Sequence, residues 1–180
     1  MSIQKFEIKG MRKNIELKAK AYDFKLQLKA ANELADKIGG VLIQKDTIYN
    51  SSNGRLKLRE FSGNTAELIF YKRVDKTDSK LCEYLITSIT DAASTNEILS
   101  AALGTIGEVE KHRTLLFCGQ TRIHFDRVKS LGEFIEFEYV LETDEPEENG
   151  RVALETLKNK LNIEPSMLIN CAYIDLITAR

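Results

Sequence analysis

The chain has 180 residues and carries 26 basic and 27 acidic side chains, which gives a net charge of −1 at pH 7. That length suits one domain with a sizeable core, and the balanced charge argues against attraction of the whole molecule to nucleic acid. No apolar run could span a membrane, no secretory signal opens the chain, and Cys82, Cys118 and Cys171 lack the spacing of a zinc or redox motif. We therefore expect a cytoplasmic protein with reduced thiols and no membrane or nucleic-acid partner.

The first half of the chain predicts strands around one helix. A strand over 12–22 alternates polar and apolar residues, and Asp23 is a suitable N-cap for a helix over 24–38 that Gly39 and Gly40 end. Strands follow over 41–49, 55–60 and 66–73, with turn-forming residues at 51–54 and 62–65.

The second half continues the pattern after a polar loop at 75–79. We expect a strand over 81–90, a short helix capped by Ser94 or Thr95 and stopped by Gly104, and strands over 107–118, 121–128 and 133–142. The acidic residues at 144–148 suit the start of a helix to Leu161, and short helical pieces follow at Pro165 and at 173–177. About eight strands in antiparallel hairpins, with three or four helices, predict an α+β fold containing a barrel.

Charged residues occupy every second position of several predicted strands, and side chains at that spacing project from one face. In an ordinary half-buried strand, this charged face would meet water. Because four or five strands share the pattern, we favour a closed barrel with a polar interior and an apolar, helix-covered exterior. One central cavity should then receive the side chains of Arg55, Lys57, Arg59, Lys111, Arg113, Arg122, Glu136 and Glu138.

Five segments in order resemble the CYTH superfamily of triphosphate tunnel enzymes, and their spacing is similar to its class IV adenylyl cyclase-like branch. The segment 14–18 resembles the Glu-x-Glu-x-Lys signature, and the match continues at 54–60, 66–73, 121–126 and 131–138. The resemblance covers about residues 12–178. We therefore expect a single domain over 12–180, preceded by an extension at 1–11.

The resemblance implies an eight-stranded antiparallel tunnel that binds a triphosphate and Mg²⁺ or Mn²⁺. The residue types agree, because lysine and arginine bind phosphate oxygens by charge-assisted bonds, and two glutamates at i, i+2 can hold a hard cation. The phosphate-side cations implied are Lys18, Arg55, Lys57, Arg59, Arg73, Lys111, Arg113 and Arg122. The metal-side carboxylates implied are Glu16, Asp126, Glu136 and Glu138. The residues implied in catalysis are Lys18, Arg59, Arg122 and Asp126.

Some assignments stay open at this point. For Arg73 and Lys111 a solvated strand face is an alternative, and His124 either orients a ligand or makes a structural hydrogen bond. Asn14 departs from the signature, because an amide brings no charge where the family has a glutamate.

Three functions are consistent with these residues. We favour metal-dependent hydrolysis of inorganic tripolyphosphate or of an organic triphosphate. The alternatives are an adenylyl cyclase that converts ATP to cyclic AMP and pyrophosphate, and a non-catalytic binder of nucleotides or polyphosphate, which Asn14 favours. The expected partner is a small-molecule triphosphate, and a homodimer is a further alternative.

Overall fold

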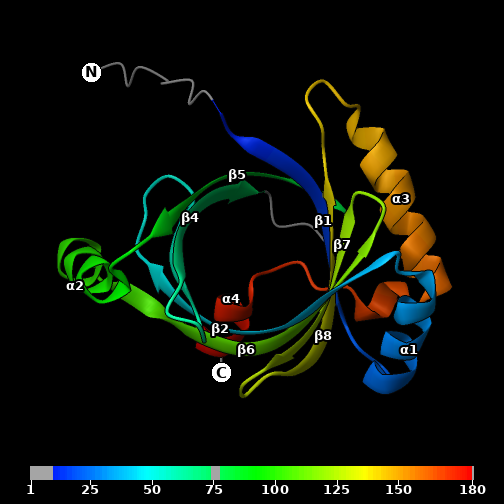
Figure 1. Ribbon diagram of the computed structural model, residues 1–180, viewed down its shortest axis with the longest axis horizontal. Coiled ribbons are helices and arrows are strands. Elements are labelled where there is room, and N and C mark those ends of the chain that lie inside the picture. The colour runs from blue at the N-terminus through cyan, green and yellow to red at the C-terminus, as the bar shows by residue number, and fades with distance from the viewer. Residues whose placement is uncertain (1–9, 74–77, 180) are drawn as a thin grey trace.

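The computed structural model describes residues 10–73 and 78–179. These residues form the strands β1 (Arg12–Lys20), β2 (Lys37–Tyr49), β3 (Arg55–Phe61), β4 (Ala66–Arg73), β5 (Lys80–Ile89), β6 (Thr105–Cys118), β7 (Thr121–Val128) and β8 (Gly132–Val140). They also form the helices α1 (Phe24–Leu34), α2 (Ala92–Leu103), α3 (Glu147–Lys160) and α4 (Tyr173–Thr178), with a 3-10 turn at Pro165–Met167. The strands close into an antiparallel barrel in the order β1-β5-β4-β3-β2-β6-β7-β8 (Figure 1). The predicted α+β class and eight-stranded antiparallel barrel are therefore confirmed.

The alternation along each strand separates the outside of the barrel from its inside. On β1, Ile15 and Leu17 belong to an outer apolar core, whereas Asn14, Glu16 and Lys18 line the central cavity. That outer core lies between the barrel and the helices α1 and α3, on the side of β1, β7 and β8 (Figure 1). A second outer cluster joins α2 to β2 and β3. The helices thus bury the apolar faces and leave the charged faces to the interior.

The pairing of β1, β8 and β7 sets the polar side chains of the interior in rows. Because paired residues lie side by side in antiparallel strands, residues that share a row can interact across strand boundaries. One row contains Glu16, Glu138 and Arg122, and the next contains Lys18, Glu136 and His124.

Helix α4 enters the ring of strands rather than covering its outside (Figure 1). Tyr173 and Ile174 pack there against Ile48 of β2 and Val109 of β6, and the Tyr173 ring lies 5.0 Å from that of Phe134. The C-terminal segment therefore fills part of the barrel with apolar side chains and forms one boundary of the cavity.

The predicted boundary between the first helix and the next strand is wrong. Helix α1 ends at Leu34, and Gly39 and Gly40 lie within β2, at a shift in its register with β6. A Cβ atom at Gly39 would lie 2.6 Å from Cγ of Leu115, and Gly40 has a φ of +91°. The two glycines therefore allow close packing and a bulge in a strand rather than stopping a helix.

The predicted cap of the second helix is also wrong. Helix α2 begins at Ala92, because the side chain of Asp91 accepts a hydrogen bond from the backbone N–H of Ser94 at 3.0 Å. Residues 1–9 of the predicted extension and 75–77 of the predicted loop lie outside the described residues. Among the helices described, none is long and apolar enough to cross a membrane.

Candidate functional site

The interior of the barrel contains a cavity of ≈ 870 Å³, counted out to its open mouth. Most of the residues predicted for the site line this cavity: Glu16, Lys18, Lys57, Arg59, Arg73, Lys111, Arg113, Arg122, Glu136 and Glu138. Arg55 and Asp126 are not among its lining residues. Lys111 and the side chain of Arg73 are almost completely buried, so the alternative of a solvated strand face is wrong for both.

Arg55 was expected in the central cavity, but it lies beside α4. Its guanidinium makes two hydrogen bonds of 2.8 Å to the carboxylate of Asp175. It lines a separate pocket with Tyr71, Lys72 and Arg73. The two-residue phase of β3 was predicted correctly, but the position of α4 directs the first cation of the strand away from the cavity.

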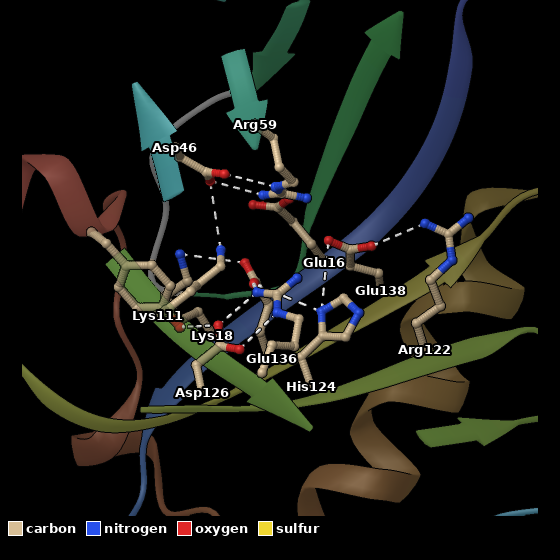
Figure 2. Close-up of polar contacts among 12 residues, drawn as sticks. Glu16, Lys18, Asp46, Arg59, Lys111, Arg122, His124, Asp126, Glu136 and Glu138 are labelled. Carbon is tan, nitrogen blue, oxygen red and sulfur yellow. Dashed lines mark hydrogen bonds and ion pairs between the residues drawn. The ribbon is translucent and has the colours of Figure 1, made fainter. Parts of the chain in front are cut away.

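Asp46 of β2 organises the cations of one wall, and sequence analysis missed it (Figure 2). Its carboxylate accepts hydrogen bonds from Arg59 at 2.7 and 2.8 Å and from Lys57 at 3.1 Å, and Nζ of Lys111 lies 3.6 Å away. Burial alone would raise the pKa of Asp46, but Arg59, Lys57 and Lys111 together lower it well below its usual range. The sequence did contain a signal for this role, because Asp46 is a lone acidic residue at one of the alternating positions of β2 that face inward.

Arg113 is held by two carboxylates deep in the barrel. It makes paired 2.6 Å hydrogen bonds to Asp126, and its Nη2 lies 2.6 Å from Glu136. The hydroxyl of Tyr173 donates to Asp126 at 2.9 Å. Because both oxygens of Asp126 are already engaged, this geometry favours a positioning role for it. The metal and catalytic roles that the sequence suggests for Asp126 stay predictions.

His124, Glu136 and Glu138 form the cluster best suited to a metal ion, with one ligand atom from each lying within 4.8 Å of the others. Nδ1 of His124 is buried, makes no hydrogen bond to the described residues, and lies 3.8 Å from Glu136 and 3.9 Å from Glu138. Burial and the neighbouring Arg113 lower the pKa of His124, so its imidazole is neutral at neutral pH. Two carboxylate oxygens suit Mg²⁺ or Mn²⁺, and a neutral imidazole nitrogen beside them suits Mn²⁺ better.

The two glutamates of this cluster stay ionised despite their burial. Burial would raise the pKa of Glu136, but Lys18, Arg113 and the protonated form of His124 lower it well below its usual range. Burial likewise opposes ionisation of Glu138, and the protonated form of His124, together with Arg113 and Arg122, lowers its pKa. Both can therefore act as anionic oxygen ligands at neutral pH.

Glu16 lies next to this cluster, but the pKa of its carboxyl is shifted in the opposite direction. It forms an ion pair with Arg73, yet burial raises its pKa, and the nearby Glu136 and Glu138 act in the same direction. A bound cation would offset the repulsion among these three carboxylates. Glu16 is thus a further oxygen donor that the arrangement could recruit.

Two lysines of the cavity lie against the ring of Tyr173. Nζ of Lys18 lies 4.0 Å from the centre of the Tyr173 ring and 3.3 Å from Glu136, while Nζ of Lys111 lies 5.5 Å from the same ring. Burial, with the charge of Arg113, lowers the pKa of Lys111 to about 7, although Asp46 opposes the shift. Tyr173, like Asp46, was missed, because its helical segment gave no sign that it enters the barrel.

The chain matches the sequence pattern of the CYTH domain over residues 12–172. Its fold is similar to that of the protein PH1012 of Pyrococcus horikoshii OT3, with 20% identity, a TM-score of 0.81, and 91% of this chain and 98% of that chain covered. It is also similar to a candidate adenylate cyclase from Vibrio parahaemolyticus, with 20% identity, a TM-score of 0.75, and coverage of 94% and 99%. A Hippeastrum protein described as a candidate adenylyl cyclase with a dominant triphosphatase activity has 14% identity, a TM-score of 0.65, and coverage of 94% and 96%. No curated protein matches the chain in sequence.

Proposed function

Because the chain belongs to the CYTH domain family, we propose that it is a divalent-metal-dependent enzyme that hydrolyses a triphosphate inside the barrel. The observation that carries this proposal is the division of charge within one cavity. Three cations, Lys57, Arg59 and Lys111, gather around Asp46. Glu136 and Glu138 gather around His124, and they are paired with Arg113 and Arg122. A polyanion needs the first group, and the metal ion that accompanies it needs the second.

The cations are suited to bind phosphate oxygens without large rearrangement. Lys57, Arg59 and Lys111 share one carboxylate, so their positive ends already converge at Asp46. Arg113 lines the same cavity and is held in place by Asp126 and Glu136. Preorganised charges of this kind favour the developing negative charge of phosphoryl transfer, because little reorganisation is needed during the reaction.

A metal ion would be held by Glu136, Glu138 and His124, with Glu16 beside them. When bound, such an ion would polarise phosphate oxygens and lower the pKa of a water molecule. The chain's own contribution is to keep Glu136 and Glu138 ionised, His124 neutral and Lys18 close to Glu136. Lys18, Arg59 and Arg122 remain the proposed catalytic cations, and Arg122, bonded to Glu138 at 3.4 Å, is the most exposed of them.

Cyclisation of ATP is the second candidate, since relatives of similar fold are candidate adenylyl cyclases. The two reactions would use the same cations and metal ligands. They differ in the attacking group, which is water in hydrolysis and the ribose 3′-hydroxyl in cyclisation.

The test is an assay of products released from tripolyphosphate and from ATP, with Mg²⁺, with Mn²⁺ and with EDTA. We expect metal-dependent release of orthophosphate. Glu138→Gln should lower this rate at least tenfold, whereas the matched control Glu133→Gln, whose exposed side chain lies on the same strand and pairs with Arg127, should not. Cyclic AMP and pyrophosphate from ATP would favour the cyclase. Binding of triphosphates without any turnover would leave only a non-catalytic binder.

A further inference from the structure

The wall of the cavity formed by β4 and β5 differs from the rest of its lining. The residues that these two strands contribute are uncharged apart from Arg73, which is paired with Glu16. They are Ile69, Tyr71, Cys82, Tyr84 and Ile86. By contrast, the charged side chains of the cavity come mainly from β1, β3, β6 and β8. The cavity therefore has a charged side suited to phosphates and metal, and an uncharged side that this function does not use.

Two polar groups at the uncharged wall are buried and have no hydrogen-bond partner among the described residues. These are Oδ1 of Asn14, a residue 4% exposed, and the hydroxyl of Tyr84, a residue 9% exposed. Both residues line the cavity. They lie on adjacent paired strands, because Asn14 pairs with Cys82, two residues before Tyr84. Buried polar groups are nearly always satisfied, so a pair that faces a cavity indicates a ligand that supplies the missing bonds.

The other side chains of this wall remain neutral. Burial raises the pKa of Tyr71 to about 12, and it raises that of the Cys82 thiol still further above its usual range. A phosphate group would gain nothing against Ile69 and Ile86, and it would lose its hydration there. Inorganic tripolyphosphate, which is charged along its whole length, cannot use this wall.

From these observations we infer that the β4–β5 wall binds the uncharged part of a nucleoside triphosphate, whose phosphates occupy the charged side. This inference rests on the proposed function and narrows its substrate to an organic triphosphate. A nucleobase has flat faces that pack on aliphatic and aromatic side chains, and its edges carry N–H donors and ring acceptors. Asn14 and Tyr84 can bond those edges or the hydroxyls of the sugar, while Ile69, Ile86 and Tyr71 contact the faces.

This inference also explains why position 14 is an asparagine, a question that the sequence left open. The signature that the chain resembles has a glutamate at this position. A carboxylate here would add negative charge beside Glu16, whose burial already disfavours ionisation. An amide keeps this wall neutral and still offers hydrogen bonds, so the departure from the signature is consistent with selection of an organic group.

The test compares the affinities of ATP and inorganic tripolyphosphate by calorimetric titration in EDTA, where no turnover interferes. We expect the wild-type protein to bind ATP about tenfold more tightly. Tyr84→Phe and Ile86→Ala should each lower this preference about three- to tenfold, the size of one neutral hydrogen bond or of a truncated apolar contact. Tyr22→Phe removes an exposed hydroxyl outside the barrel and should leave the preference at its wild-type value. Thermal unfolding of each variant checks that it is folded, and Ile86, already 37% exposed, tolerates truncation.

The outcomes separate the two proposals. If wild-type protein binds tripolyphosphate as tightly as ATP or more tightly, the inference is wrong even though the proposed function stands. The inference is also wrong if Tyr84→Phe and Ile86→Ala weaken the binding of both ligands by equal factors. If neither ligand binds in EDTA and neither is hydrolysed or cyclised with Mg²⁺ or Mn²⁺, the proposed function itself is refuted.

Discussion

Asp46 provides the sharpest test of how the interior is held together. Asp46→Asn keeps the size of the side chain but removes the charge that three cations share. Removing one partner from a buried ion-pair cluster costs about 3–5 kcal/mol, because the remaining charges lose their compensation. For a chain of this size, each kcal/mol of lost stability lowers the melting temperature by about 2–4 °C. A loss of about 3 kcal/mol, the lower end of the range above, should therefore lower the melting temperature by about 6–12 °C.

Tripolyphosphate should partly reverse this loss. A polyanion can replace the missing carboxylate between Lys57, Arg59 and Lys111, and a ligand that binds only the folded state raises its stability. The ligand-induced rise in melting temperature should therefore be larger for Asp46→Asn than for the wild type, and orthophosphate should have a much smaller effect. Calorimetry with and without each anion measures both quantities.

The pH dependence gives an independent check on the same residue. The folded-state pKa of Asp46 lies well below its ordinary value of 3.8. Its stabilisation is therefore fully present above about pH 5 and is lost as the pH falls through the folded-state pKa. Asp36→Asn, which alters an exposed carboxylate bonded to the backbone of Gly119, is the matched control. An Asp46→Asn protein as stable as the wild type, at neutral and acid pH alike, would refute the reasoning.

Three further predictions concern the metal, Lys111 and Asn14. Glu136→Gln and Glu138→Gln should each weaken Mn²⁺ binding at least tenfold in a calorimetric titration of folded protein, and unaltered affinity in both would place the ion elsewhere. The pKa of Lys111 is about 7, so Lys111 should take up a proton when tripolyphosphate binds near pH 8. The heat of binding to the wild type should therefore vary with the ionisation enthalpy of the buffer, and this variation should be smaller for Lys111→Arg. Asn14→Glu should tighten Mn²⁺ binding by adding a carboxylate near Glu16, and superimposable turnover curves against metal concentration would exclude position 14 from the metal site.

The amino-acid sequence by itself determined which side chains face the interior. Strand side chains alternate with a period of two whatever the fold around them, so the inward phase of Lys57, Arg59, Lys111 and Arg113 could be derived locally. The antiparallel barrel followed from the number of such strands and their short connections. The family resemblance added the metal and the triphosphate, which alternation alone does not specify.

Only the tertiary structure decided which inward residues meet. Asp46 reaches Arg59 and Lys111 because β2 lies between β3 and β6 in the barrel. The strand β6 is far from β2 in the sequence, so this contact could not be read from neighbouring residues. Arg55 follows the same phase as Arg59, yet α4 brings Asp175 to it from 120 residues away and takes it out of the cavity. The strands β4 and β5 of the uncharged wall are consecutive in the chain, but Asn14 joins this wall only because β1 closes the barrel against β5. Strand phase is a local property of the backbone, whereas these contacts depend on long-range pairing, which no short window of sequence contains.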